Sequence, residues 1–236
     1  LLHTVLMGSL LIWWGVIECL GLLALPLTFS VFSARAAHGY PFAKIISILL
    51  VSYVAWVLGH LGVPYSAALL GSLLAFIGIN AWLLQRQGEA MRQWLRDDGR
   101  RTIALHMAIW AAGFLFFAWQ RSLHPDIAGQ EKFMDFAFFN TLIRTESLPP
   151  IDPWMSGEAF NYYYFGYLLC ANLDRALAFV GSNLSYNLCI ATIAGLALSQ
   201  CAAVVWTVTQ RMGVAVLAAV LGLVAGNVDG FLQLLE

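Results

Sequence analysis

Charged side chains are scarce in this chain. Only 12 of its 236 residues are Lys or Arg and 13 are Asp or Glu, together 11%, whereas 61% are hydrophobic. A soluble domain typically has about 25% charged and about 45–50% apolar residues. A water-soluble fold of this composition would expose more apolar surface than solubility permits. The sequence therefore predicts a protein that crosses the membrane several times, and its net charge of -1 excludes nucleic-acid binding.

Cysteine is also scarce, and its spacing excludes two kinds of site. The four cysteines lie in apolar stretches and none forms a CxxC pair: Cys19, Cys170, Cys189 and Cys201. This pattern argues against both a zinc site and a disulfide framework. We interpret the four side chains as small hydrophobic residues.

Long apolar runs are what the sequence has in abundance. A helix needs about 20 residues to cross the hydrocarbon core. The candidate runs are residues 5–32, 42–61, 67–84, 103–119, 162–180, 184–209 and 213–235, the last interrupted by Gly226, Asn227, Asp229 and Gly230. They predict an all-α, polytopic transmembrane helix bundle of about seven spans. The chain starts at Leu1 rather than Met and ends after an apolar run, so we expect a piece of a longer protein.

Basic residues in the connections predict the orientation of the chain. Residues 85–101 hold five arginines, Arg86, Arg92, Arg96, Arg100 and Arg101, against three acids. This excess indicates a cytoplasmic connection in a multi-pass protein of the cell membrane. Alternate threading then puts Arg35 and Lys44 on the same side and the long loop 120–161 on the exterior. We expect two parts: residues 1–101, with three helices and the basic loop, and residues 102–236, with the acidic loop and the start of a core.

The loop 120–161 concentrates the acids of the chain. It contains Asp126, Glu131, Asp135, Glu146, Asp152 and Glu158. Residues 130–145 lack Gly and Pro, which favours an amphipathic helix lying in the membrane interface. Glu131 and Asp135 are four residues apart, so they project from nearly one face of such a helix, an arrangement suited to general acid–base chemistry. A nearby cation, Arg121, Lys132 or Arg144, would bind a phosphate group. Solvated surface charge is the simpler alternative.

Prolines and tyrosines follow the predicted helix. Pro149, Pro150 and Pro153 restrict the backbone and so fix where Asp152 and Trp154 point. Three consecutive tyrosines, Tyr162, Tyr163 and Tyr164, stand at the outer end of the run 162–180. Such residues are typical of an aromatic belt at the membrane surface, and stacking on sugar rings is the alternative use.

Several motifs together resemble a known family. They are Pro125-Asp126, Gly129, Glu131-Lys132, Met134-Asp135, Pro149-Pro150, Asp152-Pro153-Trp154, Gly157-Glu158 and Asn161-Tyr162-Tyr163-Tyr164-Phe165-Gly166-Tyr167. Further matches are Trp13-Trp14 with Pro26, Gly39-Tyr40 with Lys44, and Gly226-Asn227 with Asp229-Gly230. The chain thereby resembles, over nearly its whole length, the YYY-domain family of bacterial and archaeal membrane proteins, which lack an assigned activity.

The YYY-domain family is in turn similar to the GT-C glycosyltransferases, which use sugars attached to polyprenyl phosphates. In those enzymes a core helix leads into a long exterior loop with an early catalytic acid, and a Pro-Pro element enters the next helix. The run 103–119, Glu131, Pro149-Pro150 and the run 162–180 keep this order. The resemblance implies Glu131 as the base and Asp135 as a residue that tunes it or holds a divalent cation. The usual adjacent Asp-Glu pair is replaced here by Glu131-Lys132.

Substrate contacts are also implied by the resemblance. The donor would be a polyprenyl-phosphate sugar, and the residues expected to bind it are Arg121, Asp126, Lys132, Arg144, Asp152, Trp154, Glu158, Asn161, Tyr162, Tyr163 and Tyr164. Two alternatives stay open, a non-catalytic subunit that contacts other membrane proteins and a proton-coupled transporter. The sugar, the acceptor and the need for a metal are not specified by the sequence.

Ionisable residues within apolar runs bear on the transporter alternative. Glu18, Asp174, Arg175 and Asp229 are costly in the bilayer, and Arg175 is the expected cation of an internal ion pair. His3, His60 and His106 are interpreted as bundle-facing residues, so no haem is expected. Threading puts the glycosylation-like motif Asn183-Leu184-Ser185 on the cytoplasmic side, where it would not be used.

Overall fold

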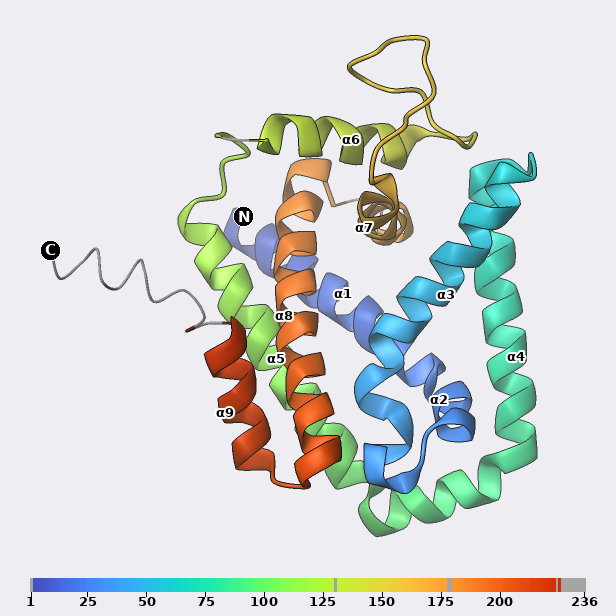
Figure 1. Cartoon of the computed structure of the whole chain (residues 1–236), viewed down its shortest axis with the longest axis vertical. Helices are drawn as coiled ribbons and strands as arrows, with labels where there is room; N and C mark the ends of the chain where they lie inside the picture. Colours follow the sequence, from blue (N-terminus) through green and yellow to red (C-terminus); the bar gives the residue numbers. More distant parts are fainter. Residues whose placement is uncertain (1, 130, 178–179, 224, 226–236) are drawn as a thin grey trace, which may run out of the picture.

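The computed structural model describes residues 2–129, 131–177, 180–223 and 225, and these form an all-α helix bundle (Figure 1). The helices are α1 (Leu2–Leu23), α2 (Leu25–Val31), α3 (Tyr40–His60), α4 (Tyr65–Trp94), α5 (Arg100–Leu123), α6 (Lys132–Arg144), α7 (Tyr164–Ala176), α8 (Ser182–Thr209) and α9 (Met212–Leu223). Two short turns, η1 (Ala34–Gly39) and the π-helical η2 (Leu95–Gly99), link them. The predicted fold class is confirmed.

Several helices are long and apolar enough to cross a membrane. They are Ala34–His60, Tyr65–Leu123 and Ser182–Thr209, and Met7–Leu23 with Leu25–Val31 is long and apolar enough as a pair that is bent by 43° at its break. The stretch Tyr65–Leu123 folds back at η2, so α4 descends and α5 rises in Figure 1. The predicted runs 5–32, 42–61, 67–84, 103–119 and 184–209 therefore coincide with α1–α2, α3, α4, α5 and α8.

Helix α7 differs from the prediction of a span over residues 162–180. It has 13 residues, which at 1.5 Å per residue gives about 20 Å, well short of the roughly 30 Å hydrocarbon core. It lies below α6 and is seen end-on in Figure 1, across the direction of the long helices. Hydropathy alone does not distinguish such a helix from a crossing one. The prediction of a fifth span here is wrong.

Because α7 does not cross the membrane, α8 runs in the opposite direction to the one that alternate threading predicts. At its start, the Asn187 side chain donates to the carbonyl of Pro125 at 3.0 Å, which ties it to the long loop. At its end, Arg35 donates to the carbonyls of Thr207 and Val208 at 3.2 and 3.1 Å. Helix α8 therefore starts at the end of the bundle that carries loop 120–161, contrary to the threading.

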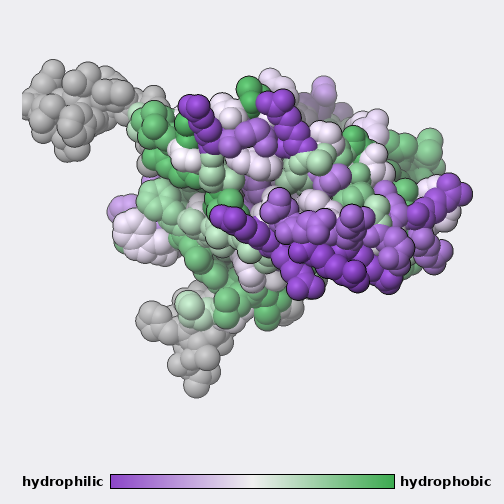
Figure 2. All heavy atoms as spheres, turned by 90° about the horizontal axis from the view of Figure 1, so that it is seen from below, coloured by the Kyte–Doolittle hydropathy of each residue, from purple (hydrophilic) through white to green (hydrophobic). Residues whose placement is uncertain are grey.

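This reversal moves two features to the opposite end of the bundle from the predicted one. The Asn183-Leu184-Ser185 motif lies at the loop end, and Arg211 lies beside η1. Figure 2 looks onto the η1 end, where hydrophilic side chains gather. The predicted basic connection 85–101 lies there as a helical elbow made of the end of α4, η2 and the start of α5 (Figure 1). The division of the chain at residue 101, inside this elbow, stays a prediction.

The last predicted span is described only in part. Helix α9 has 12 residues and packs on α8 through the buried Ala202, Ala215 and Ala219. The predicted break at Gly226, Asn227, Asp229 and Gly230 lies outside the described residues.

The core depends on close helix contacts and one aromatic anchor. Helices α5 and α8 cross at Gly113 and Gly195, where a Cβ on Gly195 would lie 2.7 Å from the backbone nitrogen of Phe114. The Trp13 indole donates to Thr192 Oγ1 at 3.0 Å and so joins α1 to α8. These contacts fix the middle of α8 against α1 and α5.

The buried charges pair differently from the prediction. Lys44, expected near the inner surface, is buried and lies 3.0 Å from Glu18. Room for it exists because residue 21 is glycine, where a Cβ would lie 2.7 Å from Lys44 Cγ. Arg175, the predicted internal cation, instead pairs with Glu146 at 3.1 Å. Asp174 is buried, and its Oδ1 has no hydrogen-bond partner among the described residues.

Candidate functional site

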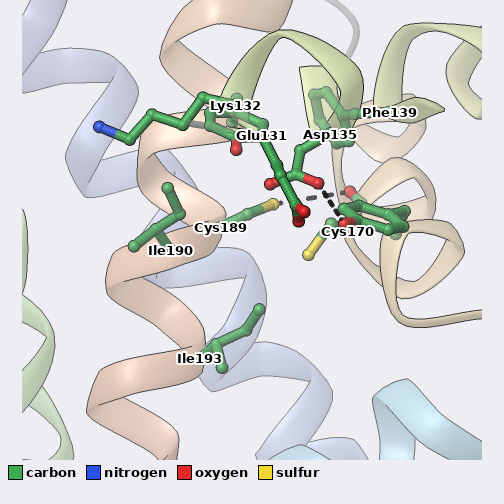
Figure 3. Close-up of a pocket in the computed structure, with 10 residues that line it drawn as sticks. Glu131, Lys132, Asp135, Phe139, Cys170, Cys189, Ile190 and Ile193 are labelled. Carbon is green, nitrogen blue, oxygen red and sulfur yellow. Dashed lines mark hydrogen bonds between the residues drawn. The ribbon is translucent and has the colours of Figure 1, made fainter. Parts of the chain in front are cut away.

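A cavity of about 640 Å³ opens beneath the start of α6 (Figure 3). Helices α6, α7 and α8 build it, together with Glu131, which precedes α6. Its lining residues are Glu131, Lys132, Asp135, Phe139, Tyr167, Cys170, Tyr186, Cys189, Ile190 and Ile193. The two predicted catalytic residues, Glu131 and Asp135, therefore lie in one cavity.

Helix α6 positions both carboxylates. It lies across the top of the bundle, and its apolar face buries Phe138, Phe139 and Leu142 (Figure 1). Glu131 occupies the position directly before the helix, without a side-chain capping hydrogen bond, and Asp135 belongs to its first turn. Carboxylates at this end are stabilised by the positive end of the helix dipole. A helix is present at Lys132–Arg144, within the predicted range 130–145, and its place in the membrane interface stays a prediction.

Asp135 is held by Tyr167, the last residue of the tyrosine-rich motif, to which the sequence assigned no role at the site. The Tyr167 hydroxyl donates to Asp135 Oδ1 at 2.5 Å. Burial and then the adjacent Asp135 carboxylate raise the pKa of Tyr167, so its hydroxyl stays protonated and can donate. Tyr186 also lines the cavity, and its ring centroid lies 5.9 Å from that of Phe139.

The predicted cations are not equally close to the cavity. Lys132 lines it, and Figure 3 shows its ammonium pointing away from the two carboxylates. Arg121 donates to Asn187 Oδ1 at 2.5 Å and to the carbonyls of His124 and Asp126, so it anchors the loop to α8. Arg144 is exposed in the last turn of α6, away from Glu131. Lys132 is the cation that can reach a ligand here.

None of the three consecutive tyrosines lines the cavity, and the rings of Tyr162 and Tyr163 pack against each other with centroids 4.6 Å apart. The Tyr162 ring lies 5.5 Å from that of Phe138, and Tyr163 is 83% exposed. Tyr164 turns towards α3, where its hydroxyl accepts from the Trp56 indole at 3.0 Å. The aromatic residues at the cavity are Phe139, Tyr167 and Tyr186 instead.

The other residues predicted to bind substrate lie in the loop segments before and after α6, and they do not line the cavity. Asp152 Oδ1 accepts from the backbone nitrogens of Trp154 and Met155 at 2.7 and 3.1 Å, which stabilises a turn. Trp154 is 63% exposed at this turn. Asp126, Glu158 and Asn161 are exposed and do not line the cavity either.

The cavity offers a divalent cation two carboxylates, those of Glu131 and Asp135. Mg²⁺ is commonly held by one or two carboxylates together with waters and substrate phosphate oxygens. Among the described residues, no group of three or more His, Cys, Asp and Glu side chains is placed to hold a metal ion. His60 bonds to Tyr164 at one end of α3, and His106 is buried in α5. The side chain of His3 lies outside the described part.

An apolar cavity of about 580 Å³ adjoins the carboxylate cavity. It lies between α3, α7 and α8, and its walls include Ile45, Leu49 and Leu196. Tyr167, Cys170 and Ile193 line both cavities. The carboxylate cavity and the apolar cavity therefore lie side by side and share this wall.

Together, the fold and these cavities define a polytopic, all-α membrane protein with a carboxylate-lined cavity under an amphipathic helix. Residues 50–236 match the family described as uncharacterized membrane protein (DUF2298), and the chain belongs to this family. No curated protein and no solved structure matches the chain.

Proposed function

We propose that this protein transfers a sugar from a lipid-phosphate-linked donor to a hydroxyl group, at the membrane face that carries loop 120–161. The observation that carries the proposal is the convergence of Glu131 and Asp135 in an open cavity that adjoins an apolar one. A cavity of about 640 Å³ is within the usual range of about 300–1,000 Å³ for small-molecule sites.

In the proposed reaction a carboxylate takes the proton of the acceptor hydroxyl. The acceptor oxygen then bonds to the anomeric carbon of the sugar, and the bond from that carbon to the phosphate oxygen breaks. Asp135 accepts the hydrogen bond of Tyr167, which leaves Glu131 as the carboxylate better placed to act as base. Lys132 neutralises the departing lipid phosphate once its flexible side chain turns inwards.

The apolar cavity supports a lipid as the carrier of the sugar. Its aliphatic walls suit a polyprenyl chain, because burial of apolar surface is favourable and needs no specific partner. The YYY-domain and GT-C resemblance points to the same donor through the order of α5, Glu131 and Pro149-Pro150. Because α7 is too short to cross, this protein would depart from the expected GT-C arrangement after the loop.

We propose that this face is the cell exterior. Arg35, Arg211 and the arginines of the elbow gather at the opposite end of the bundle, as expected for the cytoplasmic side of a membrane protein.

The test uses the full-length protein and a panel of polyprenyl-phosphate hexoses labelled in the sugar. Glu131→Gln and Asp135→Asn are expected to slow consumption of the donor by about 100-fold or more, the usual contribution of a positioned base. Glu158→Gln is the matched control, because Glu158 is exposed and lies outside the cavity. Normal consumption by both cavity variants would exclude the proposal.

A non-catalytic subunit is the second candidate. It is favoured by the exposed apolar side chains of Ile151, Trp154 and Met155 on the segment that projects above α6 (Figure 1). Such a surface is typical of a contact with another protein. Co-purification of a membrane partner that is lost in Trp154→Ser, with no donor consumption by the parent, would favour this candidate. A proton-coupled transporter is less favoured, since Glu18 is already paired with Lys44.

A further inference from the structure

Two cysteines from different helices meet at the wall of the carboxylate cavity. Cys170 belongs to α7 and Cys189 to α8, and both line the cavity. The Cys189 thiol lies 3.8 Å from the carbonyl oxygen of Cys170 and also contacts the Cys170 side chain. Figure 3 shows the two sulfur atoms next to each other at this wall. The other two cysteines, Cys19 and Cys201, do not line the cavity.

This close approach is the one that a disulfide bond requires. Its two Cα atoms must lie within about 7 Å of each other, and a thiol that contacts the main chain of its partner residue is compatible with such a separation. The two cysteines are 19 residues apart in the sequence, so their closeness results from the packing of α7 on α8. The absence of a CxxC motif therefore gives no information about this pair.

The surroundings of the pair favour a disulfide over a metal site. Zinc takes three or four protein ligands, and the described part of the chain has no group of three His, Cys, Asp or Glu side chains placed to hold a metal ion. Cys189 is 3% exposed, whereas Cys170 is half-buried and faces the open cavity. A small reagent that enters the cavity therefore reaches Cys170 first.

We propose that Cys170 and Cys189 form a reversible disulfide bond that fastens α7 to α8 beneath Asp135. The oxidant is a low-molecular-weight disulfide that enters the cavity. The Cys170 thiolate attacks one of its sulfur atoms, displaces one thiolate and forms a mixed disulfide. The Cys189 thiolate then attacks the Cys170 sulfur and displaces the second thiolate. The protein gains one S–S bond, the oxidant is reduced to two thiols, and the two thiol hydrogens of the protein end on these products.

The bond lies next to the residues of the proposed sugar transfer. Tyr167, whose hydroxyl donates to Asp135, precedes Cys170 by three residues and so lies on the same face of α7. A covalent link at Cys170 limits the movement of this face relative to α8. The cavity opens at the membrane face proposed to be the exterior, where disulfides form and persist. The inference rests on that proposed side for the supply of oxidant and is independent of the sugar transfer itself.

The first experiment detects the bond. Full-length protein is purified in nanodiscs under reducing conditions and then incubated with oxidised glutathione. Free thiols are blocked with N-ethylmaleimide, and proteolytic peptides are identified by mass spectrometry without reduction. We expect one link, between the peptides of Cys170 and Cys189, and full alkylation of Cys19 and Cys201. Cys170→Ala should abolish the link, and Cys201→Ala is the matched control that should keep it.

Three outcomes of this experiment would overturn the proposal. They are complete alkylation of both Cys170 and Cys189 after oxidation, glutathione retained on Cys170 without a link, and a link that includes Cys19 or Cys201. The readout needs no sugar donor, so failure of the proposed sugar transfer would leave it unchanged.

The second experiment measures whether the bond fits the packing of α7 on α8. A disulfide restricts the unfolded chain, so the thermal midpoint of the oxidised protein should exceed that of the reduced protein by about 5–10 °C. The comparison uses the parent protein in two redox states and does not depend on the folding of a variant. The difference should persist in Cys201→Ala and vanish in Cys170→Ala. A linked peptide without a rise in the midpoint would show that the bond strains this packing, and would overturn the proposal that it fastens α7 to α8.

Discussion

Lys44 Nζ lies 3.0 Å from Glu18 Oε2 in the interior of the bundle, with side-chain exposures of 4% and 5%. The pair joins α1 to α3, and Tyr40 accepts a further hydrogen bond from Lys44 at 3.4 Å. Removing one partner of a buried ion pair destabilises the folded state strongly, because the other charge is then left in the interior without compensation.

The first prediction concerns this pairing. Lys44→Met should destabilise the protein by roughly 3–5 kcal/mol, whereas the double variant Glu18→Leu/Lys44→Met should recover most of that loss. Chemical unfolding in detergent measures both. The exposed pair of Glu89 and Arg92 is the control, since its removal should change stability by at most about 1 kcal/mol. A double variant as unstable as the single one would contradict the prediction.

The second prediction concerns the crossing of α5 and α8. Gly195→Ala places a Cβ 2.7 Å from the backbone nitrogen of Phe114, and such overpacking should cost about 1–3 kcal/mol. Gly71→Ala is the matched control, because nothing lies within 4 Å of a Cβ there and the helix should gain up to about 1 kcal/mol. Thermal unfolding separates the two. Equal midpoints would show that α5 and α8 do not pack this closely.

The third prediction concerns Tyr167 as a positioning residue for Asp135. Tyr167→Phe removes the hydrogen bond to the carboxylate and should lower kcat about tenfold, within the range for a bond to a charged group, while KM stays unchanged. The measurement is steady-state consumption of the lipid-linked donor. Tyr163→Phe should behave like the parent, because Tyr163 is exposed and outside the cavity. A parallel rise in KM would indicate a role in donor binding instead.

The fourth prediction concerns the pH dependence of stability at Glu146. Hydrogen bonds from the Ser66 hydroxyl and backbone amide, with Arg175 nearby, hold the pKa of Glu146 below its ordinary value of 4.5. Because the pKa is lower in the folded state, the stabilisation is present above pH 4.5 and is lost as the pH falls through the folded pKa. Ser66→Ala should therefore flatten the fall in stability below pH 4.5. Unfolding curves at pH 3, 4 and 6 measure it, and an unchanged slope would contradict it.

The long helices could be predicted from the sequence because an apolar run is needed to cross a bilayer, whatever it packs against. The proximity of Glu131 and Asp135 was also predictable, since the two residues are four apart at the start of one helix. Tyr167, Tyr186, Cys170 and Cys189 were not, because they come from α7 and α8. Their place at the cavity depends on how α7 lies under α6, which hydropathy does not specify.

The choice of internal cation shows the same limit. Lys44 and Arg175 both lie in apolar surroundings, and the sequence favoured Arg175. The rotation of α3 about its axis directs Lys44 to Glu18, and Gly21 leaves the space for it. Arg175 lies in the last turn of α7, and its side chain reaches the end of α6, where it donates to the carbonyls of Leu142 and Thr145. Such tertiary details are decided by packing between helices and not by the apolar pattern of any one of them.

The fifth prediction tests the direction of α8, and with it the length of α7. In a background with the four native cysteines replaced by alanine, Asn183→Cys and Gly157→Cys should react with a membrane-impermeant maleimide from the same side of the membrane. Gln210→Cys and Gln93→Cys should react only from the other side, because Gln210 donates to the carbonyl of Arg35 at the η1 end and Gln93 lies on the elbow. If α7 crossed the membrane, the maleimide would label Asn183→Cys from the same side as Gln93→Cys instead. Labelling of intact cells before and after permeabilisation distinguishes these patterns and also identifies the exterior face, because that is the face labelled before permeabilisation.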